Sequence, residues 1–429
     1  MAWRPRDLAL LNLLWLGLNL QTAALAPLVV PLQALALVTP GALASAEQAR
    51  FIGLLGALGA VVALIVQPLT GALSDRTHAS LGRRRPHIAW GTALAVAGAL
   101  LAGLAGGPVA FAVGLILLQV GNNATTASFQ ALLPDLVPHD RRGAASGWLG
   151  LMTIVGSAGS LGLGYLLLAS ARPGSAQAGR GAFLFYVLGA AVLGVIALAT
   201  IAVIREPAVA TQPPRSLRSW LEPWRHPAFA RVFAARVFVM LGFTLFMTFI
   251  EYYFARVAHV TDFVGATAGV ALLALATAVV SAFALGGLSD RWGRVRLAAL
   301  ASAVMAAAAI AFQFLRPGSP LWPLGLLFGL GYGGYMSVDW ALAVDALPSR
   351  LSAGRDLGIW SLASTVPGIA APALGGAVVS IWASAGNVTG GYQAVFALAA
   401  VLFAAGTVAV LRVPEPRPLP YPSRQAGRV

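Results

Sequence analysis

Charged side chains inside apolar stretches are the residues of this sequence best placed to do chemistry. Arg236, Glu251 and Asp339 each lie within an apolar run long enough to cross a bilayer. An intramembrane charge is costly unless it is paired or hydrated, so such residues are candidates for moving an ion or a proton. Arg236 and Glu251 lie about 22 Å apart along one helix, too far to pair. We expect Asp339 and Glu251 to couple transport to protons. The alternatives are a gate role for Asp339 and interfacial pairing of Glu251 with Arg256 or His259.

Two polar stripes mark candidate binding surfaces. Within the segment 108–133, five polar residues fall within about 100° of helical arc: Gln119, Asn122, Asn123, Thr126 and Gln130. Within 8–35 the same pattern is made by Asn12, Trp15, Asn19 and Thr22, before Pro27 and Pro31, which permit a kink. The alternative is hydrogen bonding between helices, worth only about 0.6 kcal/mol on average.

Aromatic residues add to these stripes. Trp15, Tyr332, Tyr335 and Trp360 could stack on a sugar ring while amide groups bind its hydroxyls, although many membrane Trp and Tyr residues are interface anchors. We expect these aromatics and the two stripes to bind one small solute. Because the set is neutral and rich in amides, it favours an uncharged polyhydroxyl compound over an organic anion.

One loop sequence occurs twice. The stretch Gly71-Ala72-Leu73-Ser74-Asp75-Arg76 recurs 215 residues later as Gly286-Gly287-Leu288-Ser289-Asp290-Arg291. A second set, Ala131-Leu132, Asp135 and Pro138, recurs 210 residues later as Ala341-Leu342, Asp345 and Pro348. Two membrane halves related by an internal repeat are typical of secondary transporters.

The repeated aspartates indicate a gate. Asp75 and Asp290 end apolar helices, where the dipole is already negative, so each needs a cation or the N-terminus of another helix. Arg76 and Arg291, or the starts of neighbouring helices, can supply that charge. A pair between helices locks one conformation, whereas the alternative is an Arg-rich loop that only orients the protein. The expected gate residues are Asp75, Arg76, Asp135, Arg142, Asp290, Arg291, Asp345 and Arg355.

The elements that must position these residues are membrane helices. With 59% hydrophobic and 10% charged residues, the chain is not an ordinary soluble globule. Spans of about 20 residues are predicted at 8–35, 50–73, 88–105, 108–133, 144–169, 182–204, 230–257, 263–287, 297–315, 320–345, 356–383 and 391–412. No HExxH, Walker loop, GxSxG or His/Cys metal cluster occurs, so neither an enzyme, a cofactor nor a metal site is predicted.

Charge predicts the topology. Of the 28 basic residues, all arginine, 22 fall in the tails and the even-numbered loops. Cytoplasmic loops are the Arg-rich ones, so both termini are expected on the cytoplasmic side. The membrane is expected to be the cell's inner (plasma) membrane. The net charge of +14 needs no nucleic-acid partner to explain it. We expect an N-terminal six-helix half at 1–204, a linker at 205–229, a C-terminal half at 230–412 and a tail at 413–429.

The repeated loops resemble the signature of the major facilitator superfamily, which lies between its second and third and its eighth and ninth helices. Within that family the chain resembles the sucrose-type branch of glycoside, pentoside and hexuronide carriers. The likeness rests on Gly71 to Arg76, then Gly82-Arg83-Arg84-Arg85-Pro86, and on Asn122-Asn123 followed by Ala131-Leu132-Leu133 and Asp135. The resemblance implies twelve helices in two halves related by a parallel pseudo-twofold repeat, and proton-coupled sugar symport by alternating access.

Two positions depart from that branch. Sucrose-type carriers place an aspartate three residues before the Asn-Asn pair and an arginine just before Ala-Leu-Leu, whereas this chain has Gln119 and Gln130. The carboxylates with which melibiose-type relatives bind a cation are also absent from the second and fourth helices. Any coupling must therefore use another group.

We expect a monomeric carrier of a sugar or glycoside. The alternatives are an exporter of drugs or amphipathic metabolites and a membrane sensor that transports nothing.

Overall fold

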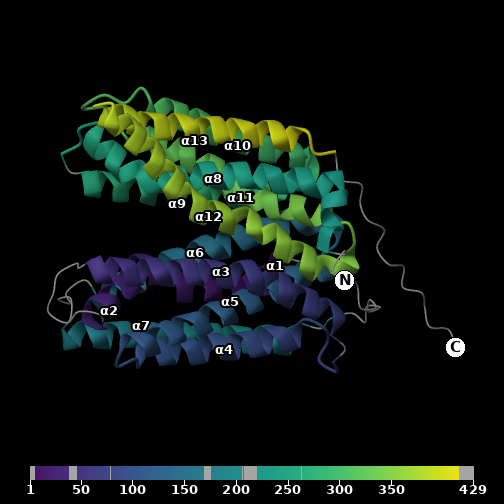
Figure 1. Ribbon diagram of the computed structural model, residues 1–429. Helices are drawn as coiled ribbons and strands as arrows, with labels where there is room; N and C mark the ends of the chain where they lie inside the picture. The colour runs from purple at the N-terminus through teal and green to yellow at the C-terminus, as the bar shows by residue number, and fades with distance from the viewer. Residues whose placement is uncertain are drawn as a thin grey trace. The chain divides into compact units, whose positions relative to one another are not determined.

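All regular structure in the described part of the chain is helical (Figure 1). The computed structural model describes residues 5–37, 46–77, 79–168, 175–204, 206, 220–261 and 263–414. The longer helices are α1 Pro5–Thr22, α2 Val30–Leu37, α3 Ala46–Arg76, α4 Arg85–Gly103, α5 Pro108–Leu136, α6 Arg142–Leu168, α7 Ala176–Val203, α8 Pro227–Arg256, α9 Phe263–Trp292, α10 Arg294–Phe312, α11 Trp322–Asp345, α12 Ala353–Ser384 and α13 Val388–Leu411. Short helical turns are η1 Leu25–Val29, η2 His139–Arg141, η4 Pro223–Arg225 and η5 Arg350–Ser352.

Ten of these helices are long and apolar enough to cross a membrane: α3 to α10, α12 and α13. The predicted all-α membrane class is therefore confirmed, and most helices extend a few residues beyond their predicted spans. The full set of twelve spans stays a prediction, as does its pseudo-twofold repeat.

The first predicted span is interrupted where prolines were expected to permit a kink. Between α1 and α2 lies the π-helix η1, in which Pro27 has no amide hydrogen to donate. The amide of Val30 instead reaches back to the carbonyl of Leu25, the five-residue step of a π-helix. The prolines therefore change the helical pitch within this segment.

The chain forms two compact units. Unit 1 holds Met1–Asp135, Trp148–Arg215 and Leu351–Ala370, and unit 2 holds Leu136–Gly147, Ser216–Arg350 and Ala371–Val429. Two helices, α6 and α12, contribute to both units. The division into two sequence halves, with a linker and a tail, stays a prediction.

Unit 1 is built on close helix packing. A Cβ added at Gly114 of α5 would lie 2.5 Å from the backbone nitrogen of Ala102 on α4, and one at Gly121 would lie 2.5 Å from the carbonyl oxygen of Gly91. Small residues let membrane helices approach this closely. Helix α7 packs on α1 and α4, and its Tyr186 belongs to the buried apolar core.

Unit 2 uses the same device on α11. A Cβ at Gly325 would lie 2.9 Å from the carbonyl oxygen of Val270 on α9, and the hydroxyl of Ser281 donates to the carbonyl of Leu330 at 2.6 Å. Helices α10 and α13 pack together and against α11 and α8 respectively. A stacked pair, Phe246 and Phe328, with ring centres 4.3 Å apart, joins α8 to α11.

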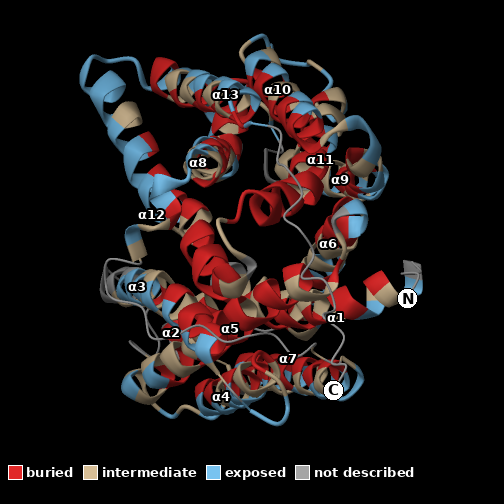
Figure 2. Cartoon of the chain, turned by 90° about the vertical axis from the view of Figure 1, so that its right-hand side faces the viewer, coloured by how far each residue is buried: buried red, intermediate tan, exposed pale blue. Residues whose placement is uncertain are grey.

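Burial changes along α12, which is mostly buried over its first turns and mostly exposed near its end (Figure 2). Helix α5 is buried over its second half. These two buried stretches carry most of the polar contacts described next.

Candidate functional site

Asp75 holds the first turn of α12. Its carboxylate, in the last turn of α3, accepts hydrogen bonds from the backbone amides of Gly354 at 3.1 Å and Arg355 at 2.9 Å. The neighbouring hydroxyl of Ser74 donates to the carbonyl of Gly71 at 2.9 Å. A helix N-terminus attracts an anion, so Asp75 stabilises α12 rather than its own helix.

Arg84 lies between two carboxylates. Its guanidinium contacts Asp75 at 2.6 Å and Asp135 at 3.2 Å, and Arg83 also contacts Asp135, at 2.6 Å. The Arg84 side chain has no exposed surface. Burial disfavours its charge, but Asp75 and Asp135 together raise the pKa of Arg84 above its usual value. Arg84 is therefore a permanently charged bridge between α3 and α5.

Unit 2 contains the same arrangement. Asp290 accepts hydrogen bonds from the first-turn amides of α6, Gly143 at 2.9 Å and Ala144 at 3.1 Å, and Ser289 donates to Gly286 at 2.7 Å.

A buried arginine again lies between two carboxylates. Arg294 pairs with Asp290 at 2.8 Å and also with Asp345, and Arg142 contacts Asp345 at 2.5 Å. The sequence repeat is thus also a repeat of contacts.

Of the two partners expected for Asp75 and Asp290, the starts of neighbouring helices contact both carboxylates, and two arginines that the sequence did not single out, Arg84 and Arg294, contact them as well. Arg76 and Arg291 are exposed, whereas Arg84 and Arg294 are buried against Asp75 and Asp290. Consecutive residues on a helix point about 100° apart, so an arginine directly after the aspartate points elsewhere. Arg84 and Arg294 are themselves related by the 210-residue shift that relates Asp135 to Asp345, a signal that could have identified them.

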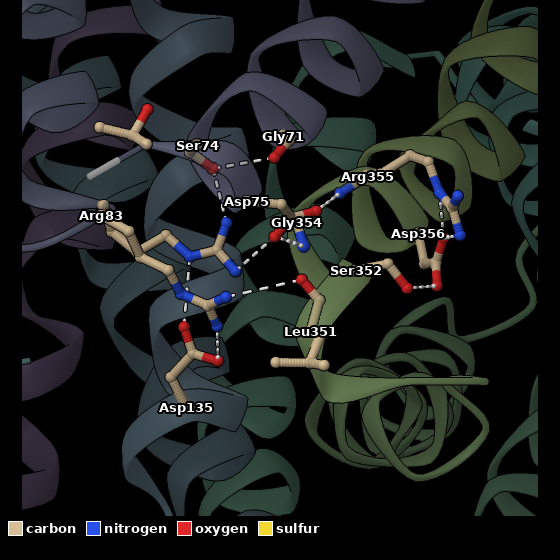
Figure 3. A network of polar contacts seen from close by, with 12 residues as sticks. Gly71, Ser74, Asp75, Arg83, Asp135, Leu351, Ser352, Gly354, Arg355 and Asp356 are labelled. Carbon is tan, nitrogen blue, oxygen red and sulfur yellow. Dashed lines mark hydrogen bonds and ion pairs between the residues drawn. The ribbon is translucent and has the colours of Figure 1, made fainter. Parts of the chain in front are cut away.

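Arg355 contributes its backbone amide to Asp75 and its side chain to Asp356. The guanidinium donates to the Asp356 carboxylate at 2.7 Å, and Ser352 donates to the same carboxylate at 2.9 Å (Figure 3). Asp356 is fully buried and was not singled out in the sequence. It fixes the Arg355 side chain beside the start of α12.

Glu206 holds the loop that carries Arg83 and Arg84. Its carboxylate accepts hydrogen bonds from the backbone amides of Arg83 at 2.8 Å, Arg84 at 3.0 Å and Arg85 at 2.8 Å, at the N-terminus of α4. Gly82 precedes them with φ of 104°, and a Cβ there would lie 2.7 Å from the Glu206 carboxyl carbon. A glycine is required here, and no sequence pattern identifies Glu206 as the partner of this loop.

The polar stripe of α5 contacts two other helices in unit 1. Gln67 of α3 donates to Asn123 at 2.5 Å, and Asn123 donates to the carbonyl of Gln119 at 2.7 Å. Further along α5, Gln130 accepts a hydrogen bond from Ser361 of α12 at 3.1 Å. These bonds bring α3 and α12 against one edge of the stripe.

The other edge of this stripe faces α1. Trp15 packs edge-on against Phe129, with ring centres 6.0 Å apart, and Phe129 lies on the same side of α5 as Asn122 and Thr126. On α1 itself, Asn19 donates to the carbonyl of Trp15 at 2.8 Å and accepts from Ser157 at 3.4 Å. Asn19 therefore has local packing partners, while Trp15 lies against the side of α5 that carries Asn122 and Thr126.

Several buried polar atoms of α1, α3 and α5 have no hydrogen-bond partner among the described residues: Asn122 Nδ2 and Oδ1, Trp15 Nε1, Asn12 Oδ1 and Gln67 Oε1. We call this set the open amide surface. All of its groups are uncharged, and it contains both donors and acceptors. Buried polar atoms are normally satisfied, so this surface is suited to bind a neutral polar ligand.

The remaining predicted residues are divided between the units. Trp360 is buried in unit 1. In unit 2, Asp339 forms an ion pair with Arg236 of α8, Tyr332 stacks on Phe243 with ring centres 4.5 Å apart, and Tyr335 is buried. The side chain of Glu251 lies outside the described part of the structure.

The family profile of the Major Facilitator Superfamily matches residues 20–354. The chain belongs to the Major Facilitator Superfamily. The resemblance read from its repeated loops is thereby confirmed, and the protein is a transporter rather than an enzyme.

Relatives of this superfamily member include sugar carriers. A stretch of 113 residues is 38% identical to the sucrose transport protein SUT2 of Oryza sativa, covering 21% of this chain and 23% of that protein. A stretch of 125 residues is 31% identical to the general alpha-glucoside permease of Schizosaccharomyces pombe, covering 25% of this chain and 22% of that protein. The matches thus span less than a quarter of these relatives' length.

The fold matches solved members of the superfamily. The Escherichia coli fucose:proton symporter FucP superposes with a TM-score of 0.74 at 16% sequence identity, over 94% of this chain and 96% of that one. At this identity the likeness shows the fold alone.

Proposed function

We propose that this transporter carries a neutral sugar or glycoside by alternating access, in symport with protons. The observation that carries the proposal is the open amide surface, above all Asn122, whose two side-chain polar atoms are both without a partner among the described residues. A hydroxyl group both donates and accepts hydrogen bonds, so it suits an amide that has both capacities free.

The charge of the open amide surface favours an uncharged ligand. A carboxylate or phosphate ligand would be expected to face an arginine, whereas in the described part of the chain the stripe hydrogen-bonds to an amide, a hydroxyl and a backbone carbonyl. Trp15 adds an aromatic face, which packs well against the C–H face of a sugar ring. The partial likeness to sucrose transport proteins and an alpha-glucoside permease supports the same ligand class.

Alternating access follows from burial and from the gate contacts. The atoms of the open amide surface have almost no solvent-accessible area in this conformation, so a ligand reaches them only when helices move. Asp75 and Asp290 hold the starts of α12 and α6, and release of these contacts is the movement we infer. The moving bodies would be the two predicted six-helix halves.

Proton coupling is assigned to Asp339, with Glu251 as the second candidate. The ion pair with Arg236 gives Asp339 a partner that a proton must displace. Protonation of Asp339 would break its ion pair with Arg236, and loss of the proton would restore the pair, so the two states differ in a buried contact. This role fits the glutamines at 119 and 130, which cannot carry a proton in transport.

The cellular setting remains as proposed from charge. The protein would be a monomer in the cell's inner membrane with both termini in the cytoplasm. The gate residues Asp75, Asp135, Asp290 and Asp345 would then face the Arg-rich cytoplasmic side.

Ligand-dependent thermal stabilisation of the purified protein tests the ligand class. Sucrose, maltose and methyl glucoside are compared with glucuronate and with a hydrophobic cation. We expect at least one neutral sugar to raise the melting temperature, because a ligand that binds only the folded state stabilises it. Stabilisation by the hydrophobic cation alone would favour the exporter instead.

A further inference from the structure

Gln67 lies where α3 and α12 cross. A Cβ added at Gly358 of α12 would lie 2.7 Å from the Gln67 carbonyl oxygen and 2.6 Å from the Cα of Pro68. One turn further along α3, Gly71 is packed directly on the backbone of Gly354 (Figure 3). These glycines bring the two backbones into contact, and we call this contact the α3–α12 crossing.

The side chain of Gln67 has one fixed bond and one open atom. Asn123 uses its Nδ2 to donate to the carbonyl of Gln119, so it presents its Oδ1 to Gln67. Only the Nε2 of Gln67 can donate there, at 2.5 Å, which fixes the orientation of its amide. The atom left over is the carbonyl oxygen Oε1, which is buried and has no partner among the described residues. A hydroxyl donor would satisfy this oxygen.

Residue 67 is also next to a point where α3 can bend. Pro68 lies inside the helix and has no amide hydrogen for the carbonyl of Leu64. Beyond Pro68, Asp75 holds the first turn of α12 through the amides of Gly354 and Arg355. A movement of α3 at Gln67 would therefore move the end of α3, where Asp75 binds the first turn of α12.

We propose that Gln67 determines sugar specificity and links the ligand to the gate. Its Oε1 accepts a hydrogen bond from one hydroxyl of the carried sugar. Its Nε2 holds α3 to α5, and its backbone touches α12, so the occupied site and the α3–α12 crossing share this residue. This inference rests on the proposed sugar transport and adds to it a recognition group on α3.

Analogues of the carried sugar test the hydroxyl contact. In wild-type protein, replacing that one hydroxyl with fluorine, which donates no hydrogen bond, should raise the apparent KM about threefold to tenfold. Gln67→Leu should bind the parent sugar as weakly as the wild type binds that analogue, and should no longer distinguish the two. Wild-type discrimination retained at every hydroxyl position in Gln67→Leu would overturn the proposal.

Hydrogen exchange tests the link to the crossing without any ligand. Gln67→Leu should speed exchange of the first-turn amides of α12, residues 353–358, because the bond from α3 to Asn123 is lost. The matched control is Gln33→Leu, which removes a buried glutamine of α2 that donates to the backbone carbonyl of Ala102 at 3.2 Å and also has an open Oε1. If Gln67→Leu fails to fold, Gln67→Asn keeps the amide but shortens it by one methylene.

The two measurements separate the possible failures. A wild type that binds and moves no sugar contradicts the proposed function, whereas the exchange measurement still decides the part played by Gln67 at the crossing. Exchange at 353–358 that is equal in wild type, Gln67→Leu and Gln67→Asn overturns the link.

Discussion

At the scale of single residues, Asn122 is the group on which the ligand proposal depends most. It is buried, and both of its side-chain polar atoms are open. Leaving such atoms unsatisfied is unfavourable by about 1–3 kcal/mol per group, which a bound hydroxyl or water would relieve. Packing gives these two atoms no partner among the described residues, as the ligand proposal requires.

Asn122→Ala should weaken sugar binding without loss of folding. Two hydrogen bonds to the ligand would be removed, so we expect the apparent KM to rise about tenfold. Thr126→Ala and Asn123→Ala should also raise KM, the latter by freeing Gln67. The control is Ser128→Ala, a buried hydroxyl on the opposite side of α5. Wild-type KM in all three site variants would assign the stripe to helix packing.

At the scale of elements, the starts of α12 and α6 are held by carboxylates from other helices. Each contact joins the end of one helix to the beginning of another that is far away in sequence; Asp75 and Gly354 are 279 positions apart. Breaking a buried ion pair by removal of one partner is unfavourable by about 3–5 kcal/mol. These are therefore contacts whose loss should change the conformation.

Asp75→Asn should release the start of α12, and Asp290→Asn the start of α6. The chain has no cysteine, so reporter cysteines are unique. Leu357 and Ser146 are fully buried in the two helices concerned. Leu357→Cys should react faster with a hydrophilic maleimide when combined with Asp75→Asn, and Ser146→Cys when combined with Asp290→Asn. Arg296→Gln, an exposed change on α10, serves as control. If neither aspartate substitution changes the labelling rate of its reporter cysteine, the gate proposal is wrong.

The sequence predicted part of this arrangement. Helical periodicity placed the α5 polar residues on one face, and the helix dipole argument required a cation or a helix start beside Asp75. Periodicity does not say which helix approaches that face, so the contacts of Gln67 with Asn123 and of Ser361 with Gln130 were missed. In the sequence Gln67 is flanked by apolar residues and belongs to no polar stripe. Its possible role is visible only once α12 is seen to pack against it.

The geometry of the loop before α4 was the other feature that could not be predicted from the sequence. Arg84 reaches Asp75 from the loop before α4, where Gly82 has a positive φ and the carboxylate of Glu206 accepts hydrogen bonds from the backbone. That carboxylate lies 122 positions away from Arg84. No local sequence pattern predicts a hydrogen bond between residues so far apart in the chain.

At the scale of the whole molecule, proton movement and sugar movement should be separable. Asp339→Asn should abolish accumulation of sugar against a gradient and leave exchange of sugar across the membrane intact, since exchange needs no net proton movement. In Asp339→Asn the buried Arg236 would lose the carboxylate that pairs with it. If Asp339→Asn folds poorly for this reason, the double variant Arg236→Gln/Asp339→Asn removes both charges and takes its place. Proton-driven accumulation that persists in Asp339→Asn and in Glu251→Gln would show that neither carboxylate is needed for coupling.

The most direct test of the central claim is counterflow in proteoliposomes. Vesicles that contain the purified protein are loaded with unlabelled sucrose, maltose or methyl glucoside and diluted into the same labelled sugar at trace concentration. The account predicts transient uptake of at least one neutral sugar, strongly reduced in Asn122→Ala and preserved in Ser128→Ala. Absence of counterflow for every neutral sugar, with counterflow of an amphipathic drug or an organic anion in the same vesicles, would contradict it.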